Sequence, residues 1–225
     1  MNRAAAFSLA GALLLALTGA SIVSLLPHIR QTPQPPALSL ADEILLVPLV
    51  LPEGSGQAPD NLLLAALAAD LRRSFTCEIE LASPLPLSRL SLGKDGGTLR
   101  ADTALDDLAH AYHRSGHLLL LGVTGAALSE RGDSVLGYAQ LGGNACVVTT
   151  AGLGTTPARL RERLLRSALH QIGHTFGLSH SADPQSVMFD APDTEALDAM
   201  RDCFNEEEMK ALRRIPRLHG RLRVD

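Results

Sequence analysis

Three histidines in the second half of the chain have the spacing of a metal site. His170 and His174 are four residues apart, so on a helix both imidazoles project from one face, one turn apart. Gly177 can adopt a positive φ and turn the chain sharply, and His180 follows it. Three neutral imidazoles that converge with one coordination position left open are typical of a catalytic zinc site. The pattern therefore predicts one zinc ion held by His170, His174 and His180.

Further candidate groups follow this motif. Met188, eight residues after His180, could form a hydrophobic floor beneath the imidazoles, although the residues alone favour the explanation that a single methionine is core filler. Asp183 and Asp190 could supply a base to an open site or a fourth ligand to a closed, structural one. The residues alone leave these alternatives open.

A long helix is predicted to carry the first two histidines. It opens at Pro157 and runs to about Gly173, with an apolar stripe that can pack against a sheet. Four arginines in its first half are expected to form a solvated face: Arg159, Arg161, Arg163 and Arg166. Apolar runs predict strands at residues 43–51, 77–81, 117–123, 134–141 and 145–150, and periodic segments predict helices at residues 62–75 and 103–114. This alternation favours a mixed α/β layer fold in a single domain.

The composition describes a folded domain of modest charge. Of 225 residues, 46% are hydrophobic and 20% are charged, which supplies ample apolar material for a core. The net charge of −4 and the 3% of aromatic residues argue against a nucleic-acid partner. The three cysteines have neither the number nor the spacing of a disulfide framework.

The N-terminus has the pattern of an export segment. Arg3 precedes an uncharged apolar run at residues 4–26, which is long enough to span a bilayer. Residues 1–30 are therefore predicted to be a cleaved signal peptide or a transmembrane signal anchor, with a buried core helix as the less favoured alternative. The proline-rich residues 31–36 predict an extended linker, which leaves residues 37–225 as the folded domain. The domain is expected outside the cytoplasm, secreted or anchored, with membrane contact only through the N-terminal segment.

The motif resembles the zinc signature of the metzincin peptidases, in which a methionine follows three histidines as Met188 does here. More narrowly, the segments LGVT at 121–124, GYA at 137–139 and HTFGLSH at 174–180 resemble the archaemetzincin family, while HSADPQSVM is also similar to the matrixins. The resemblance extends over residues 118–209. It implies a mixed sheet, an active-site helix, Met188 as the Met-turn, and a cleft lined by an edge strand at 135–140. An extended peptide or protein segment would pair with that strand.

Two departures from the family pattern bear on function. The family has Glu after the first histidine, to move protons during catalysis, whereas this chain has Gln171. Zinc-dependent peptide hydrolysis is therefore expected to be weak or lost, and the alternative is an inactive relative that binds peptides or a protein partner. Archaemetzincins also carry a second, four-cysteine zinc site, whose matching positions here are Ser181, Ser186, Cys203 and Glu206. With one cysteine remaining, a second structural zinc is not expected, and a helix at 205–215 should hold the C-terminal part by packing.

Overall fold

The computed structural model describes residues 44–52, 58–75 and 77–215. The N-terminal segment and linker predicted at residues 1–36 lie outside these ranges. Within them, none of the helices combines the length and the apolar composition that a membrane span requires.

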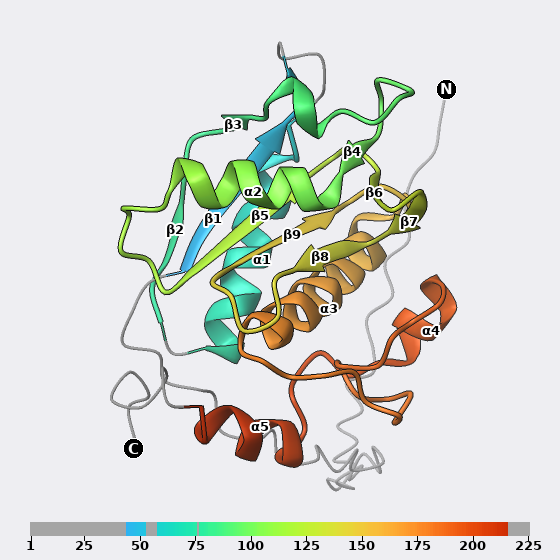
Figure 1. The fold of residues 1–225 in the computed structure, drawn as a ribbon. Coiled ribbons are helices and arrows are strands. Elements are labelled where there is room, and N and C mark those ends of the chain that lie inside the picture. Colours follow the sequence, from blue (N-terminus) through green and yellow to red (C-terminus); the bar gives the residue numbers. More distant parts are fainter. Residues whose placement is uncertain (1–43, 53–57, 76, 216–225) are drawn as a thin grey trace, which may run out of the picture. The chain divides into compact units, whose positions relative to one another are not determined.

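A mixed sheet forms the centre of the domain, as the sequence predicts (Figure 1). Its strands follow the order β2-β1-β5-β9-β8, and β3 pairs with the end of β1. Their bounds are β1 (Ile44–Val50), β2 (Ile79–Leu81), β3 (Leu85–Pro86), β5 (Leu119–Thr124), β8 (Gly137–Ala139) and β9 (Ala145–Thr149). All pairs are parallel except β8 with β9, so β8 is an antiparallel edge strand.

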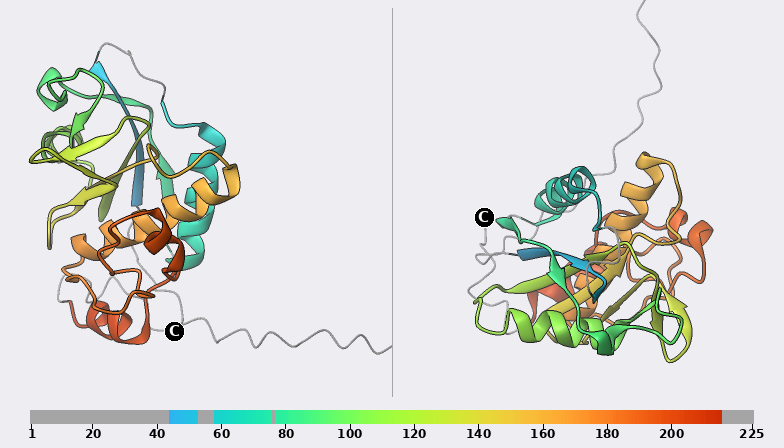
Figure 2. Two further views of the ribbon diagram at one scale, coloured as in Figure 1. Left: turned by 90° about the vertical axis from the view of Figure 1, so that its right-hand side faces the viewer. Right: turned by 90° about the horizontal axis from the view of Figure 1, so that it is seen from above.

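Helices cover both faces of this sheet. The helices α1 (Asn61–Ser74) and α3 (Pro157–Thr175) pack on one face, and α2 (Ala101–Ala111) packs on the other, as the view from above in Figure 2 shows. Strand β1 displays the alternation that produces these layers, because Ile44 and Leu46 join the α1–α3 core while Leu45 joins the α2 core. Helix α2 begins two residues before the predicted Thr103 and ends three before Arg114, since Ala101 is already buried in that second core.

The prediction of one continuous strand at 134–141 is wrong, because the structure divides this segment between two sheets. Strand β7 (Asp133–Val135) pairs with β6 (Leu128–Glu130) in a small sheet that also contains β4 (Leu99–Arg100). After Leu136, β8 pairs instead with β9 in the main sheet, with Gly137 opposite Val148. The edge of the main sheet therefore begins at Gly137, and not at residue 135. Between β3 and β4 lies a single turn of 3₁₀ helix, η2 (Arg89–Ser91).

Two short helices follow the histidine motif, namely α4 (Thr194–Ala199) and α5 (Glu206–Arg213). The Asn205 side chain accepts a hydrogen bond from Glu208 N at 2.9 Å, and the Glu208 side chain accepts one from Asn205 N at 2.7 Å. This reciprocal capping box fixes the start of α5. Met209 and Leu212 then pack into the α1–α3 core, so α5 is held by burial as expected.

The arginines of α3 are not the solvated face that the sequence predicts. Asp70 on α1, with 3% of its side chain exposed, accepts two hydrogen bonds of 2.6 Å from the Arg161 guanidinium. Asp198 on α4 forms ion pairs with the other three arginines: Arg159, Arg163 and Arg166. Asp70 is 91 residues from Arg161 in the sequence, and Asp198 is 35–39 residues from its hydrogen-bonded arginines. The two carboxylates therefore connect α1 and α4 to α3.

Replacing Asp70 with Asn is expected to lower the free energy of unfolding by about 1–3 kcal/mol, between the values for exposed and buried ion pairs. Burial acts to raise the pKa of the Asp70 carboxyl, but the Arg161 hydrogen bond and the charges of Arg73 and Arg161 outweigh it and hold that pKa below its usual range. This contribution is present above the carboxyl's unfolded pKa and is lost as the pH falls through the folded value.

Urea unfolding at neutral pH and at a pH below the folded value checks this prediction. The control is Glu207→Gln, which removes a carboxylate that is 81% exposed and should leave stability nearly unchanged. If Asp70→Asn loses the same free energy of unfolding at both pH values, the Asp70 carboxylate charge is not the source of the stabilisation.

Candidate metal centre

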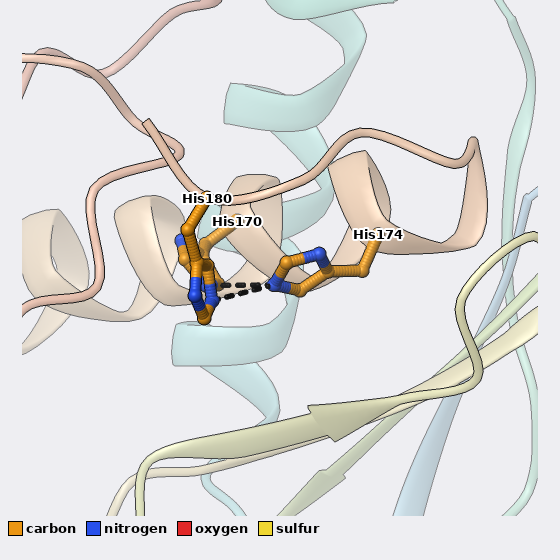
Figure 3. A group of neighbouring side chains, drawn as sticks. All are labelled: His170, His174 and His180. Carbon is orange, nitrogen blue, oxygen red and sulfur yellow. Dashed lines mark hydrogen bonds between the residues drawn. The ribbon is translucent and has the colours of Figure 1, made fainter. Parts of the chain in front are cut away.

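The structure brings the three predicted histidines together at the end of α3 (Figure 3). The Nε2 atom of His174 lies 3.0 Å from that of His170 and 3.1 Å from that of His180. Tetrahedral Zn–N bonds of about 2.0–2.1 Å place two ligand nitrogens about 3.3 Å apart, so the observed spacing fits zinc closely.

Backbone carbonyls fix the protonation of two of these rings. His170 Nδ1 lies 2.9 Å from Val187 O, and His174 Nδ1 lies 2.8 Å from Leu178 O. Because a carbonyl oxygen only accepts, each Nδ1 carries the proton, and in the neutral rings each Nε2 presents a lone pair. Lone pairs that converge at about 3 Å repel one another unless a cation lies between them. The donor set therefore fits a metal ion.

Burial keeps the first two rings neutral. Burial and the nearby His174 and His180 lower the pKa of His170 from 6.5 to about 4. Burial also lowers the pKa of His174. Since metal ligation requires neutral imidazole, both rings are ready to bind zinc at neutral pH without first losing a proton.

The end of α3 is built to return the chain to this point. Gly177 has a φ of +89°, a conformation that favours glycine, and its N–H donates to His174 O at 2.9 Å. Leu178 N also donates to Gly173 O at 2.9 Å, which positions the Leu178 carbonyl that holds His174. The same turn thus ends the helix, places the carbonyl that binds His174 Nδ1, and brings His180 next to the other two histidines.

Met188 lies beneath α3, buried to 1% exposure. A Cβ built at Gly173 would lie 2.3 Å from Met188 Sδ and 3.2 Å from Phe204 Cε1. The methionine therefore approaches the backbone of α3 closely at Gly173, which lies between His170 and His174 in the sequence.

Replacing Gly173 with Ala is expected to destabilise the fold by about 1–3 kcal/mol through overpacking, despite an intrinsic helix gain of about 1 kcal/mol. Denaturant unfolding of Gly173→Ala, Met188→Ala and the double variant measures the coupling between the two positions. The double variant should be clearly more stable than the sum of the single losses predicts. Additive losses would show that the methyl group and the methionine do not compete for space.

The acidic residues after the motif occupy different positions. Asp190 Oδ2 lies 3.7 Å from His180 Nδ1, on the ring edge away from the converging Nε2 atoms. Asp183 accepts a hydrogen bond from Gln185 N at 3.0 Å and pairs with Arg201 at 3.3 Å. Neither carboxylate belongs to the group of converging ligand atoms, so the structure places neither as a fourth ligand.

Gln171 lies on the wall of the site, between α3 and the edge strand. A Cβ built at Gly137 of β8 would lie 2.7 Å from Gln171 Cγ, so the glutamine side chain packs directly against the strand. Gln171 and His170 line the same cavity. Gln171, at the position where the metzincin signature has a glutamate, therefore lines the cavity that the three histidines also line.

A cavity of about 690 Å³ adjoins the histidines. Strand β8 forms one wall, and residues 189–194 with α4 form the opposite one. Lining residues that sequence reasoning did not single out include Glu130, Ser167, Thr194, Leu197 and Met200. Of these, only Ser167 had a local signal, since it precedes Gln171 by one helical turn.

Comparison with known proteins agrees with this architecture. The matrixin family model matches residues 93–202. The archaemetzincin of Pyrococcus furiosus is 29% identical over 161 residues, which cover 66% of this chain and 81% of that protein. The archaemetzincin of Archaeoglobus fulgidus is 42% identical over 92 residues, covering 38% of this chain and 58% of the relative.

Solved structures show the same fold. The crystal structure of the A. fulgidus archaemetzincin, complexed with malonate, has a TM-score of 0.65 at 24% identity and covers 75% of this chain and 99% of its own. The archaemetzincin of Methanopyrus kandleri has a TM-score of 0.64 at 23% identity, and the match covers 78% of this chain and 96% of that protein. The fold and the three converging histidines are those expected of a zinc metallopeptidase. In sequence and in fold the chain is archaemetzincin-like.

Proposed function

We propose that this chain binds one zinc ion through His170, His174 and His180 and holds an extended peptide beside it, with slow or no hydrolysis. The observation that carries the proposal is the convergence of three Nε2 atoms at a cavity bordered by an edge strand. When bound, zinc would supply Lewis acidity to a peptide carbonyl. The residues of the chain orient the metal and the peptide and determine whether protons can move.

Strand β8 is the element that supports peptide binding. Within the described part of the chain it pairs on one side only, with β9, and its residues line the cavity. The free edge offers backbone N–H and C=O groups to an added strand, which would give affinity with little dependence on peptide sequence. A peptide seated there would lie between the strand and the segment 189–194.

Gln171 is the reason to propose weak turnover. An amide has nearly the shape of a carboxylate and can donate or accept hydrogen bonds, but it cannot take up a proton and release it again. The cavity has other carboxylates, including Glu130 and Asp190, but Asp190 lies on the Nδ1 side of His180. The specific placement of an amide at the site favours a second candidate function, a pseudopeptidase that captures peptides or a protein partner.

The test is metal analysis combined with peptide cleavage by the full-length chain. We expect one zinc per chain, binding of extended peptides that depends on zinc, and cleavage that is slow or absent. A chelated sample is the control for both readouts. Failure to bind zinc would contradict the proposal, as would rapid, chelator-sensitive cleavage, which would direct attention to Glu130 and Asp190 as bases.

We also propose that residues 1–30 export or anchor the domain and that nucleic acid is not a partner. The support is the apolar run at 4–26 and the mildly acidic composition. Fractionation of cells that express the full chain tests the first point, because recovery in the cytoplasmic fraction would contradict it.

A further inference from the structure

Two buried polar side chains that do not line the cavity lie near the segment that holds His170. Ser186, fully buried, lies just before Met188, and Glu208, 9% exposed, comes from α5. The Ser186 hydroxyl donates to Glu208 Oε1, and Glu208 Oε2 accepts from Asn205 N at 2.7 Å. Within the described part of the chain, no basic side chain forms an ion pair with Glu208. A buried carboxylate in this setting is costly unless hydrogen bonds compensate it, so its position calls for an explanation.

The hydrogen bonds continue from this carboxylate to the first histidine. Met188 N donates to Ser186 Oγ at 2.9 Å, while Val187 O accepts from His170 Nδ1 at 2.9 Å. The Val187 carbonyl and the Met188 N–H belong to one peptide group. A single chain therefore runs from the Glu208 carboxylate through the Ser186 hydroxyl and this peptide group to the His170 ring.

All the donors in this chain point toward Glu208. Hydrogen bonds arranged in one direction polarise one another, so the carboxylate charge makes the Val187 carbonyl a stronger acceptor. A stronger acceptor at Nδ1 fixes the ring orientation and raises the basicity of the opposite nitrogen, as carboxylate partners do for metal-bound histidines.

We propose that Glu208, acting through Ser186 and the Val187–Met188 peptide group, is a positioning residue that orients His170 and strengthens it as a zinc ligand. This inference rests on the proposed zinc function. The Glu208 carboxylate on α5 would then change the zinc affinity of the site without being a zinc ligand itself. A purely structural role would consist of capping α5 and packing it against the core, with no effect on the metal.

Zinc affinity measured by competition with a chromophoric chelator distinguishes the two roles. In the full-length chain, Glu208→Gln should bind zinc about tenfold more weakly, the lower end of the range for outer partners of metal ligands. The matched control is Glu207→Gln, which removes the same charge from the same turn of α5 outside the network and should bind like wild type. Ser186→Ala, which breaks the relay but keeps the charge, should also weaken binding, and it replaces Glu208→Gln if that variant does not fold.

The His170 Nδ1–H resonance of the zinc-loaded protein gives an independent readout. It should move upfield in Glu208→Gln and in Ser186→Ala but not in Glu207→Gln, because a weaker acceptor deshields the proton less. Reduced stability with unaltered zinc affinity and an unmoved resonance would overturn the inference while leaving the zinc site intact. Absence of zinc binding by the wild type would instead overturn the proposed function, and this inference with it.

Discussion

Replacing Gln171 with Glu is expected to raise the rate of zinc-dependent peptide hydrolysis by about 10²–10⁴-fold, the usual contribution of a positioned general acid–base group. Gln171 lines the cavity beside His170 and packs against β8, so a carboxylate of the same length would lie in the cavity between the histidines and the edge strand. The substitution changes almost no volume and leaves the three histidines in place. The gain should therefore appear in kcat more than in KM.

Cleavage of a peptide mixture by zinc-loaded Gln171→Glu, beside the wild type and with a chelated sample of each, measures this gain. Gln171→Asn is the matched control, since it keeps an amide and should remain as slow as the wild type. If neither protein cleaves peptides although the variant still binds zinc, the cavity does not place a peptide for hydrolysis. If both cleave at the same measurable rate, a different residue acts as the base.

Replacing His174 with Ala is expected to weaken zinc binding by far more than the about 10–100-fold caused by losing an outer partner of a ligand. His174 is the central ligand, because its Nε2 lies about 3 Å from both of the others. Two remaining imidazoles form an incomplete site with a poorly defined geometry. The zinc-free variant should fold, since His174 lies at the edge of the cavity rather than in the core.

Thermal unfolding with and without zinc measures this effect through linkage. A ligand at about 100 times its dissociation constant stabilises the folded state by about 2.7 kcal/mol, so zinc should raise the Tm of the wild type and not that of His174→Ala. His110→Ala is the control, because His110 is an exposed histidine on α2 and its loss should leave the zinc-dependent shift unchanged. A shift retained in His174→Ala would exclude the three-histidine assignment.

Local periodicity explains why much of the site could be predicted. His170 and His174 share a helix face by spacing alone, and the positive φ of Gly177 is a conformation that favours glycine, so the return of the chain to His180 was encoded nearby. The buried strands β1, β5 and β9 were equally clear, since each is a short apolar run.

Long-range partners explain the errors. Strands β7 and β8 are separate because Val135 pairs with Leu128 in the small sheet, whereas Gly137 pairs with Val148 in the main sheet. The arginines of α3 looked solvated because their partners lie on other helices: Asp70 on α1 is 91 residues from Arg161, and Asp198 on α4 is 35 residues from Arg163. No pattern within a helix reveals a carboxylate that another helix supplies.

The sequence by itself determined the three-histidine cluster, the amide after its first histidine and the α/β class, because each follows from spacing within a short segment or from a single residue type. Only the tertiary structure decided which strand edge borders the histidines, that Gln171 packs on Gly137, and that Glu208 connects to His170 through Ser186. These features are contacts between residues far apart in the chain, and they exist only once the sheet register and the helix packing are set.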